Sequence, residues 1–448
     1  MNRDRILLTV AWLISAWIFL RYWDLTVRAE ELLVWSGIFT GLFVGAALVA
    51  SRRGLADMKG VLAAAGFWAA LVVVGSCVGL FFPLVPLGST EVQSVALLRV
   101  FDLIVPLWIL LRGVHRVWEG RTAALVTSAV PLALLAMIWG LTVRMPGQTH
   151  VGPVPPLTAV EAELAARLRA HVVTLADSIG VRGWRQPEAV RRTVDYLLGE
   201  LRDMGYTPLE LPFEVSGRTE LNLEVTLPGT SAAAEIVVVG AHYDTYDLTP
   251  GADDNASGVA AVLELARQMV NVRGERTIRF VFFATEEPPY FNTVNMGSRV
   301  YAIRAAEAGE DIFVMLSIET IGYFADGPGT QHYPPPFSLF YPDRGDFIGI
   351  VGNPATGDLT RRALRVFRET TALPSQGATP SSLVPGAELS DHASFWKEGF
   401  RAMMITDTAP FRNDNYHESS DTPETLDFAR MARVVTGTRE IIRDMAGG

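Results

Sequence analysis

Three apolar runs, each ending in ionisable side chains, constrain the fold of this chain most strongly. The runs are EIVVVGAHYD (235–244), RFVFFATEE (279–287) and IFVMLSIET (312–320). Their β-branched and aromatic residues are typical of buried parallel strands. The carboxyl ends of such strands open into one crevice of an α/β sheet. We therefore expect His242, Glu286, Glu287 and Glu319 to converge there.

Two further segments add ionisable groups to this set. In GADDNASG (251–258), the glycines and short polar residues allow a tight turn that presents Asp254 at the start of the next helix. Asp253 or Asn255 could instead serve as an ordinary helix cap. In NYHESSD (415–421), His417 lies in a polar segment, where the alternative to a functional role is a surface histidine.

Together these residues supply what two neighbouring zinc ions require. The set offers two imidazoles, a terminal carboxylate for each metal, a bridging carboxylate and a spare carboxylate to act as a base. A glutamate at the end of an apolar run, as Glu319 is, is costly unless it is paired or bound to metal. Asp244 could orient His242 for metal binding, and Asp421 could orient His417. Each motif alone is common, but the ordered set predicts a dinuclear zinc site.

Strands alternate with helical patterns from residue 158 onward, which predicts an α/β/α sandwich. Thr158 and Glu161 read as a capping box at the start of the first helix. The stretch 322–345 is rich in Pro, Gly and aromatic residues and is expected to form a loop over the cleft.

The first 150 residues predict a membrane domain of about five transmembrane helices. Their apolar stretches are 6–20, 32–50, 60–86, 94–111 and 122–143. Most approach the roughly 20 residues that cross a bilayer. With the N-terminus inside, eight basic residues lie on the cytoplasmic side against three outside. The sequence thus predicts an integral membrane protein in contact with the lipid bilayer, with a cytoplasmic N-terminus, a linker at 151–157 and an extracytoplasmic domain at 158–448.

Charge excludes one class of partner. The first 150 residues hold 12 Lys and Arg against 8 Asp and Glu, whereas the remainder holds 26 against 40. An acidic domain of this kind is a poor nucleic-acid binder.

The single cysteine, Cys77, leaves the outer domain without a disulfide, and nearly 300 residues can bury an ample core without one.

The blocks GAHYDT, GADDNASG, EE, SDHASF and YH, in this order, resemble the co-catalytic di-zinc aminopeptidases, relatives of leucyl aminopeptidases and glutamate carboxypeptidase. The resemblance covers about residues 160–446. It implies a mixed, mostly parallel sheet of eight strands flanked by helices. It also implies an exopeptidase that cleaves N-terminal peptide bonds of peptide substrates with two Zn²⁺ per chain.

The resemblance also implies a role for each matching residue. The implied assignments are His242 and Glu319 on one zinc, Glu287 and His417 on the other, Asp254 as the bridge, Glu286 as the general base and Tyr416 as a donor to the oxyanion. Family members often have a cis peptide after the bridging aspartate, which here is Asp254–Asn255.

Two departures from the family pattern and two alternative functions complete the sequence-based hypothesis. Glu319 stands where many members have Asp, and Pro288-Pro289-Tyr290 replaces a glycine-rich continuation. One alternative is a glutaminyl-cyclase-like transferase with a single zinc, against which the presence of His242 argues. The other is a non-catalytic membrane homologue, against which the retention of Glu286 and all five ligands argues.

Overall fold

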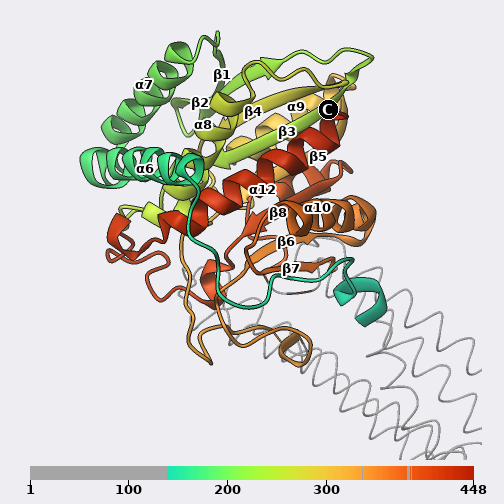
Figure 1. The fold of residues 1–448 in the computed structure, drawn as a ribbon. Coiled ribbons are helices and arrows are strands. Elements are labelled where there is room, and N and C mark those ends of the chain that lie inside the picture. The colour runs from blue at the N-terminus through green and yellow to red at the C-terminus, as the bar shows by residue number, and fades with distance from the viewer. Residues whose placement is uncertain (1–138, 335–336, 381–383, 385) are drawn as a thin grey trace, which may run out of the picture. The chain divides into compact units, whose positions relative to one another are not determined.

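The structure is a computed structural model that describes residues 139–334, 337–380, 384 and 386–448. A single mixed sheet lies at its centre, with strand order β1-β2-β4-β3-β5-β8-β6-β7 (Figure 1). The strands are β1 (Leu209–Val215), β2 (Arg218–Leu227), β3 (Ala232–His242), β4 (Arg276–Phe283), β5 (Asp311–Glu319), β6 (Ile348–Gly352), β7 (Ser375–Ala378) and β8 (Ala402–Thr406). The pairs β3–β4, β3–β5, β5–β8 and β6–β7 are parallel, and the pairs β1–β2, β2–β4 and β6–β8 are antiparallel.

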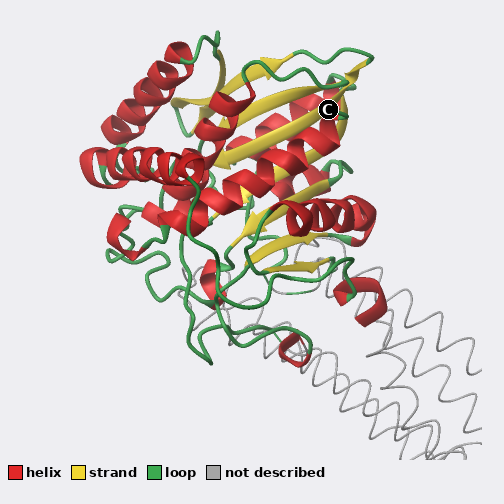
Figure 2. Ribbon diagram, in the orientation of Figure 1, coloured by secondary structure: helices red, strands yellow, loops and turns green. Residues whose placement is uncertain are grey.

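Helices cover both faces of this sheet, so the expected α/β/α sandwich is confirmed (Figure 2). The helices are α6 (Ala159–Val173), α7 (Pro187–Asp203), α8 (Gly258–Met269), α9 (Gly297–Glu307), α10 (Gly357–Thr370), α11 (His392–Lys397) and α12 (Phe428–Ala446). The predicted capping box opens α6, where the Thr158 hydroxyl accepts from the amide of Glu161 and the Glu161 carboxylate accepts from the amide of Thr158.

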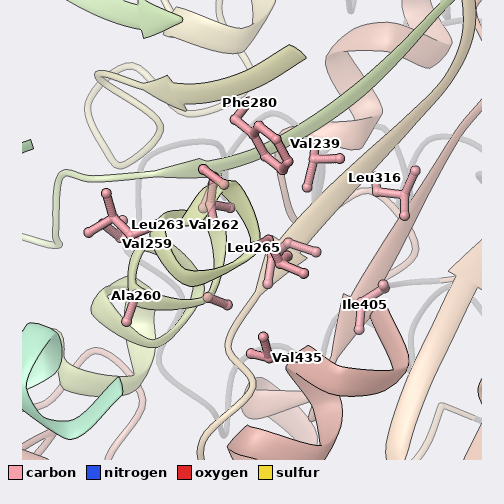
Figure 3. Close-up of a cluster of buried hydrophobic side chains, with 14 of the residues drawn as sticks. Val239, Val259, Ala260, Val262, Leu263, Leu265, Phe280, Leu316, Ile405 and Val435 are labelled. Atoms are coloured by element: carbon pink, nitrogen blue, oxygen red, sulfur yellow. The ribbon is translucent and has the colours of Figure 1, made fainter. Parts of the chain in front are cut away.

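The core explains the long apolar runs of the central strands. Successive residues of a strand point to opposite faces, and on β3 both faces are buried. Val237 and Val239 enter the cluster formed with α8 and α12, whereas Val238 enters the cluster formed with α9 and α11. Figure 3 shows the larger cluster, in which Val239 and Leu316 from the sheet lie near side chains of α8 and α12.

This topology brings the ends of the ligand-bearing strands together. His242 is in register with Phe283 on β4, and β5 runs parallel to β3 on its other side. The segments that follow β3, β4 and β5 therefore begin at the same edge of the sheet. This is the edge at which sites form in open α/β sheets.

The predicted integral membrane localisation requires correction. Within the described ranges, no helix is both long enough and apolar enough to cross a bilayer. The reason is clear in the long helices α7 and α12, which carry charged side chains along their length. The apolar stretches on which the prediction rested lie almost wholly outside the described residues.

The segment before α6 contacts α10 and β7. Arg368 on α10 donates to the carbonyl of Pro146 at 2.7 Å, and the amide of Ser375 donates to the Thr149 hydroxyl at 2.7 Å. The predicted linker at 151–157 and the domain boundary at 158 stay predictions.

A buried ion-pair network ties α6 to α8. The carboxylate of Glu264 is fully buried and accepts from Arg167 at 2.8 Å and from Arg267 at 2.9 Å. His171 Nε2 lies 3.1 Å from the same carboxylate. Burial by itself raises the pKa of Glu264, but hydrogen bonds from His171, Arg167 and Arg267 outweigh burial and lower the pKa to about 2.

The network predicts a pH-dependent stability. Because the folded pKa of about 2 lies below the ordinary value of 4.5, this stabilisation is complete above pH 4.5 and is lost as the pH falls toward 2. We expect Glu264→Gln to lower the free energy of unfolding at pH 7 by about 3 kcal/mol, since a buried charge network loses one partner. Urea unfolding at pH 7 and pH 3 should show a smaller loss on acidification in the variant than in the wild type.

Glu163→Gln is the matched control, because Glu163 pairs with the same Arg167 but its side chain is 73% exposed. Such a surface pair contributes about 0.5 kcal/mol or less. Equal effects of the two substitutions would contradict the role of the buried network.

Candidate metal centre

Five of the predicted site residues meet in two groups that share one member. His242, Asp254 and Glu319 form one group, and Asp254, Glu287 and His417 form the other. Within each group the candidate ligand atoms all lie within 4.8 Å of one another. The Asp254 carboxylate faces both imidazoles, with Oδ1 3.3 Å from His242 Nε2 and Oδ2 3.1 Å from His417 Nε2.

The terminal carboxylates complete this arrangement. Glu319 Oε2 lies 3.3 Å from His242 Nε2, and Glu287 Oε1 lies 3.3 Å from His417 Nε2. The longer side chain of Glu319 is itself held, because Ser390 Oγ donates to Oε2 at 2.6 Å. Ser390 belongs to the SDHASF block. This block therefore supports the site by holding the Glu319 carboxylate, and Ser390 itself is not among the candidate metal ligands.

The turn that carries Asp254 is fixed by its neighbours. The peptide bond between Asp254 and Asn255 is cis, as the family resemblance implies. Asn255 donates to the carbonyl of Ile318 at 3.0 Å and accepts from the amide of Gly258 at 3.1 Å. A Cβ at Gly258 would lie 2.3 Å from both Asn255 Oδ1 and the carbonyl oxygen of Ile318, which explains the glycine.

The two expected orienting aspartates hold backbone amides instead of imidazoles. Asp244 accepts from the amide of Glu286 at 3.0 Å and from that of Glu287 at 3.1 Å, whereas its carboxylate lies 3.7 Å from His242 Nδ1. The backbone carbonyl of Asp244, at 3.2 Å, is the closer partner of that imidazole nitrogen.

Asp421 acts in the same way on the other segment. Its two oxygens accept from the amide of Asp253 at 2.9 Å and from that of Asp254 at 3.2 Å. Each of these aspartates therefore fixes a pair of consecutive acidic residues by their main chain, and no hydrogen bond from Asp421 to His417 occurs among the described residues.

A buried cation that sequence analysis missed lies behind the acidic cluster. Arg182 is fully buried and donates to the carbonyls of Leu175, Gly180, Tyr243, Pro250 and Gly251. Burial lowers its pKa to about 10, and the nearby charges of Asp421 and Asp244 oppose that decrease. Nothing in the local sequence VRGW distinguishes this arginine from an exposed one.

Buried charge sets the electrostatics of the site. Burial raises the pKa of Glu286 well above its ordinary value, and Glu287 and Glu319 nearby add to the increase. Burial also raises the pKa of Glu287 to about 7. For His242 burial acts to lower the pKa, but the charge of Glu319 contributes to a net shift well above the ordinary value. These shifts show that the buried carboxylates require positive charge close to them.

The donor set fits zinc. Asp254 Oδ2, Glu287 Oε1 and His417 Nε2 are buried without a hydrogen-bond partner, although all three atoms face the same point. Unpaired buried polar atoms are costly, and a cation between them would satisfy all three. Imidazole nitrogen and carboxylate oxygen are ordinary zinc ligands.

The expected base and oxyanion donor lie beside these ligands. Glu286 is 5% exposed, and its Oε2 lies 4.0 Å from His242 Nε2. Tyr416 lines a cavity together with Glu319, and burial and the site carboxylates raise the pKa of its hydroxyl well above the ordinary value. The Tyr416 hydroxyl therefore remains protonated and can donate a hydrogen bond.

That cavity is a cleft open to solvent, with a volume of about 120 Å³, and extends along the face of β6 and β8. Its lining is mostly apolar and includes Tyr333, Phe347, Val351, Leu389, Met404 and Phe411. The loop 322–345 supplies part of the lining, as the sequence predicts for a loop over the cleft.

Asp391 has no capping role. It stands at the N-terminus of α11, where an aspartate is a common helix cap, but its side chain makes no capping hydrogen bond. Both carboxylate oxygens are buried without a partner, and burial raises the pKa to about 7. Asp253 is likewise no cap, because it accepts from the amide of Gly322 at 2.9 Å and from Asn413 at 2.9 Å.

About half of the chain matches a known protein family. Residues 222–442 match Peptidase family M28. Uncharacterized protein YfbL of Escherichia coli is 40% identical over 215 residues, 46% of this chain and 66% of the relative. A probable leucine aminopeptidase of Trichophyton verrucosum is 28% identical over 233 residues, 48% of this chain and 55% of the relative.

The fold is shared with a solved structure. BSAP, a zinc aminopeptidase from Bacillus subtilis, superposes with a TM-score of 0.51 at 14% identity, covering 63% of this chain and 95% of that one. The chain thus spans between about half and two thirds of the length of the curated relatives described above.

The amide contacts of Asp244 predict a strong effect of a small change. Asp244→Asn replaces one accepting oxygen by a donor, so one of the amides of Glu286 and Glu287 loses its partner. We expect zinc affinity to fall by about 10-fold to 100-fold, as for other residues that orient metal ligands. Competition with a chromophoric chelator measures this, and Asp195→Asn, at an exposed position of α7, is the control. Wild-type zinc affinity in Asp244→Asn would contradict the assignment.

Proposed function

We propose that this chain, whose residues 222–442 match Peptidase family M28, is a zinc-dependent aminopeptidase that removes N-terminal residues from peptides. The observation that carries the proposal is the shared carboxylate of Asp254, which faces an imidazole on each side. The relatives named leucine aminopeptidase and zinc aminopeptidase support the same activity.

The five clustered side chains would hold two zinc ions. His242 and Glu319 would bind one ion, Glu287 and His417 the other, and Asp254 both. Bound in this way, the ions would supply a water of lowered pKa and a Lewis acid for the substrate carbonyl.

The chain's own residues then act on protons and charge. Glu286 takes the proton of the attacking water and delivers it to the leaving amine, which suits a buried carboxylate with a raised pKa. The Tyr416 hydroxyl donates to the oxygen on which negative charge develops. Asp244 holds the amide of Glu286, so the base keeps its position during both transfers.

The family resemblance and the shape of the site favour a particular substrate end. The resemblance to the co-catalytic di-zinc aminopeptidases implies that the α-amino group of a peptide is held at the site, which supports exopeptidase rather than endopeptidase action. The apolar cavity beside Glu319 and Tyr416 suits a large uncharged side chain on the N-terminal residue.

The alternatives are less well supported by the same contacts. A single-zinc transferase needs one metal site, whereas both His242 and His417 contact Asp254. A non-catalytic homologue has no need of a buried carboxylate such as Glu286 beside the ligands.

Removal of the base provides the direct test. We expect Glu286→Gln to bind two zinc ions per chain and to lose activity by about 100-fold to 10,000-fold, because it removes a proton acceptor and no metal ligand. Zinc content by atomic emission and hydrolysis of leucyl amides measure the two properties separately.

A substrate pair tests exopeptidase action with the wild-type chain. Free aminoacyl amides should be cleaved, whereas their N-acetylated counterparts lack the positive α-amino group and should not be. Equal cleavage of both would overturn the aminopeptidase proposal, and one zinc ion per folded chain would overturn the two-metal site.

The cavity predicts a change of specificity. Val351→Phe adds bulk to the apolar lining without touching the ligands. We expect kcat/KM for leucyl and phenylalanyl amides to fall by about 10-fold, the effect of a few methylene groups in a hydrophobic pocket, while the value for alanyl amide stays unchanged. A parallel loss for all three substrates would show that the cavity does not receive the side chain.

A further inference from the structure

The imidazole of His417 stacks on two tyrosine rings. The Tyr416 ring lies 4.0 Å from it with planes 16° apart, and the Tyr246 ring lies 4.7 Å from it with planes 7° apart. Tyr416 is its neighbour in sequence, but Tyr246 comes from the loop after β3. The two sides of the site are therefore joined by a stack in which Tyr246 belongs to none of the ligand motifs.

This stack takes the place of a missing hydrogen bond. A metal-binding histidine usually donates its second nitrogen to an oxygen, which fixes the ring. His242 does so with the carbonyl of Asp244 at 3.2 Å. For His417 no such acceptor occurs among the described residues, since Asp421 is occupied by the amides of Asp253 and Asp254.

The loop that carries Tyr246 is held on both sides. The Thr245 hydroxyl accepts from the amide of Arg182 at 3.0 Å, and Asp247 accepts from the amide of Arg185 at 3.2 Å. Gly183 leaves room for this contact, because a Cβ there would lie 2.9 Å from the Cα of Asp247. The backbone of Tyr246 is thus fixed before the ring meets His417.

We propose that Tyr246 is a positioning residue that orients the His417 imidazole toward the metal shared with Glu287. The proposal rests on the proposed function only in taking His417 as a zinc ligand. The ring of Tyr246, and not its hydroxyl, performs this role.

The test compares Tyr246→Leu with Tyr246→Phe in the full chain, by zinc titration of the metal-free protein against a chromophoric chelator. His417→Ala and His242→Ala identify which of the two zinc affinities belongs to which site. His417→Ala should abolish zinc binding at the site that includes His417. At that same site, we expect Tyr246→Leu to weaken zinc affinity by roughly threefold to tenfold, the effect of one aromatic contact. Tyr246→Phe keeps the ring and should bind both ions as the wild type does.

Gly183→Ala provides a second variant that leaves Tyr246 in place. Its added methyl group displaces the loop at Asp247, so it should weaken the same zinc affinity and leave the other unchanged. Wild-type affinities in both Tyr246→Leu and Gly183→Ala would overturn the role of Tyr246. A wild-type chain that binds only one zinc ion would instead overturn the proposed function.

Discussion

The carboxylate of Asp254, buried between two imidazoles, is the constraint on which the rest of the domain depends. An ionised group at 2% exposure is stable only when charges and donors surround it. The strand order β4-β3-β5 brings those partners to one sheet edge, and the Asp421 carboxylate fixes the amide of Asp254. Arg182 adds a buried positive charge behind the cluster. The fold is thus organised around a concentration of negative charge that a hydrophobic core would otherwise exclude.

Local sequence pattern accounts for the centre of the sheet but not for its edges. The apolar runs that end at His242 and Glu319 became β3 and β5, because residues buried on both faces leave an uninterrupted apolar signal. The antiparallel pairing of β6 with β8 has no such signal, since strand direction depends on connections and not on composition. It was the family resemblance that implied a mixed sheet. The predicted membrane localisation was wrong for the described part of the chain.

The candidate ligands were accessible from sequence because His242, Glu287 and Glu319 come where apolar runs stop, whereas Asp254 and His417 stand in short motifs that complete the set. Their supporting contacts were not, because they join side chains to main-chain atoms. The amides held by Asp244 lie 42 and 43 positions away, and any residue type except proline at those positions would present the same N–H group. The burial of Arg182 could not be predicted for the same reason, because its five hydrogen-bond partners are backbone carbonyl oxygens. Contacts of this kind follow from the folded backbone alone.

The position of Asp421 also decides when the site can exist. It follows β8, yet it holds amides 168 and 167 positions earlier in the chain. A ribosome-bound chain that has reached β5 already carries most of the ligands but cannot yet fix the turn that presents Asp254. For the proposed peptide hydrolase, this order means that the site stays incomplete until Asp421 has been synthesised.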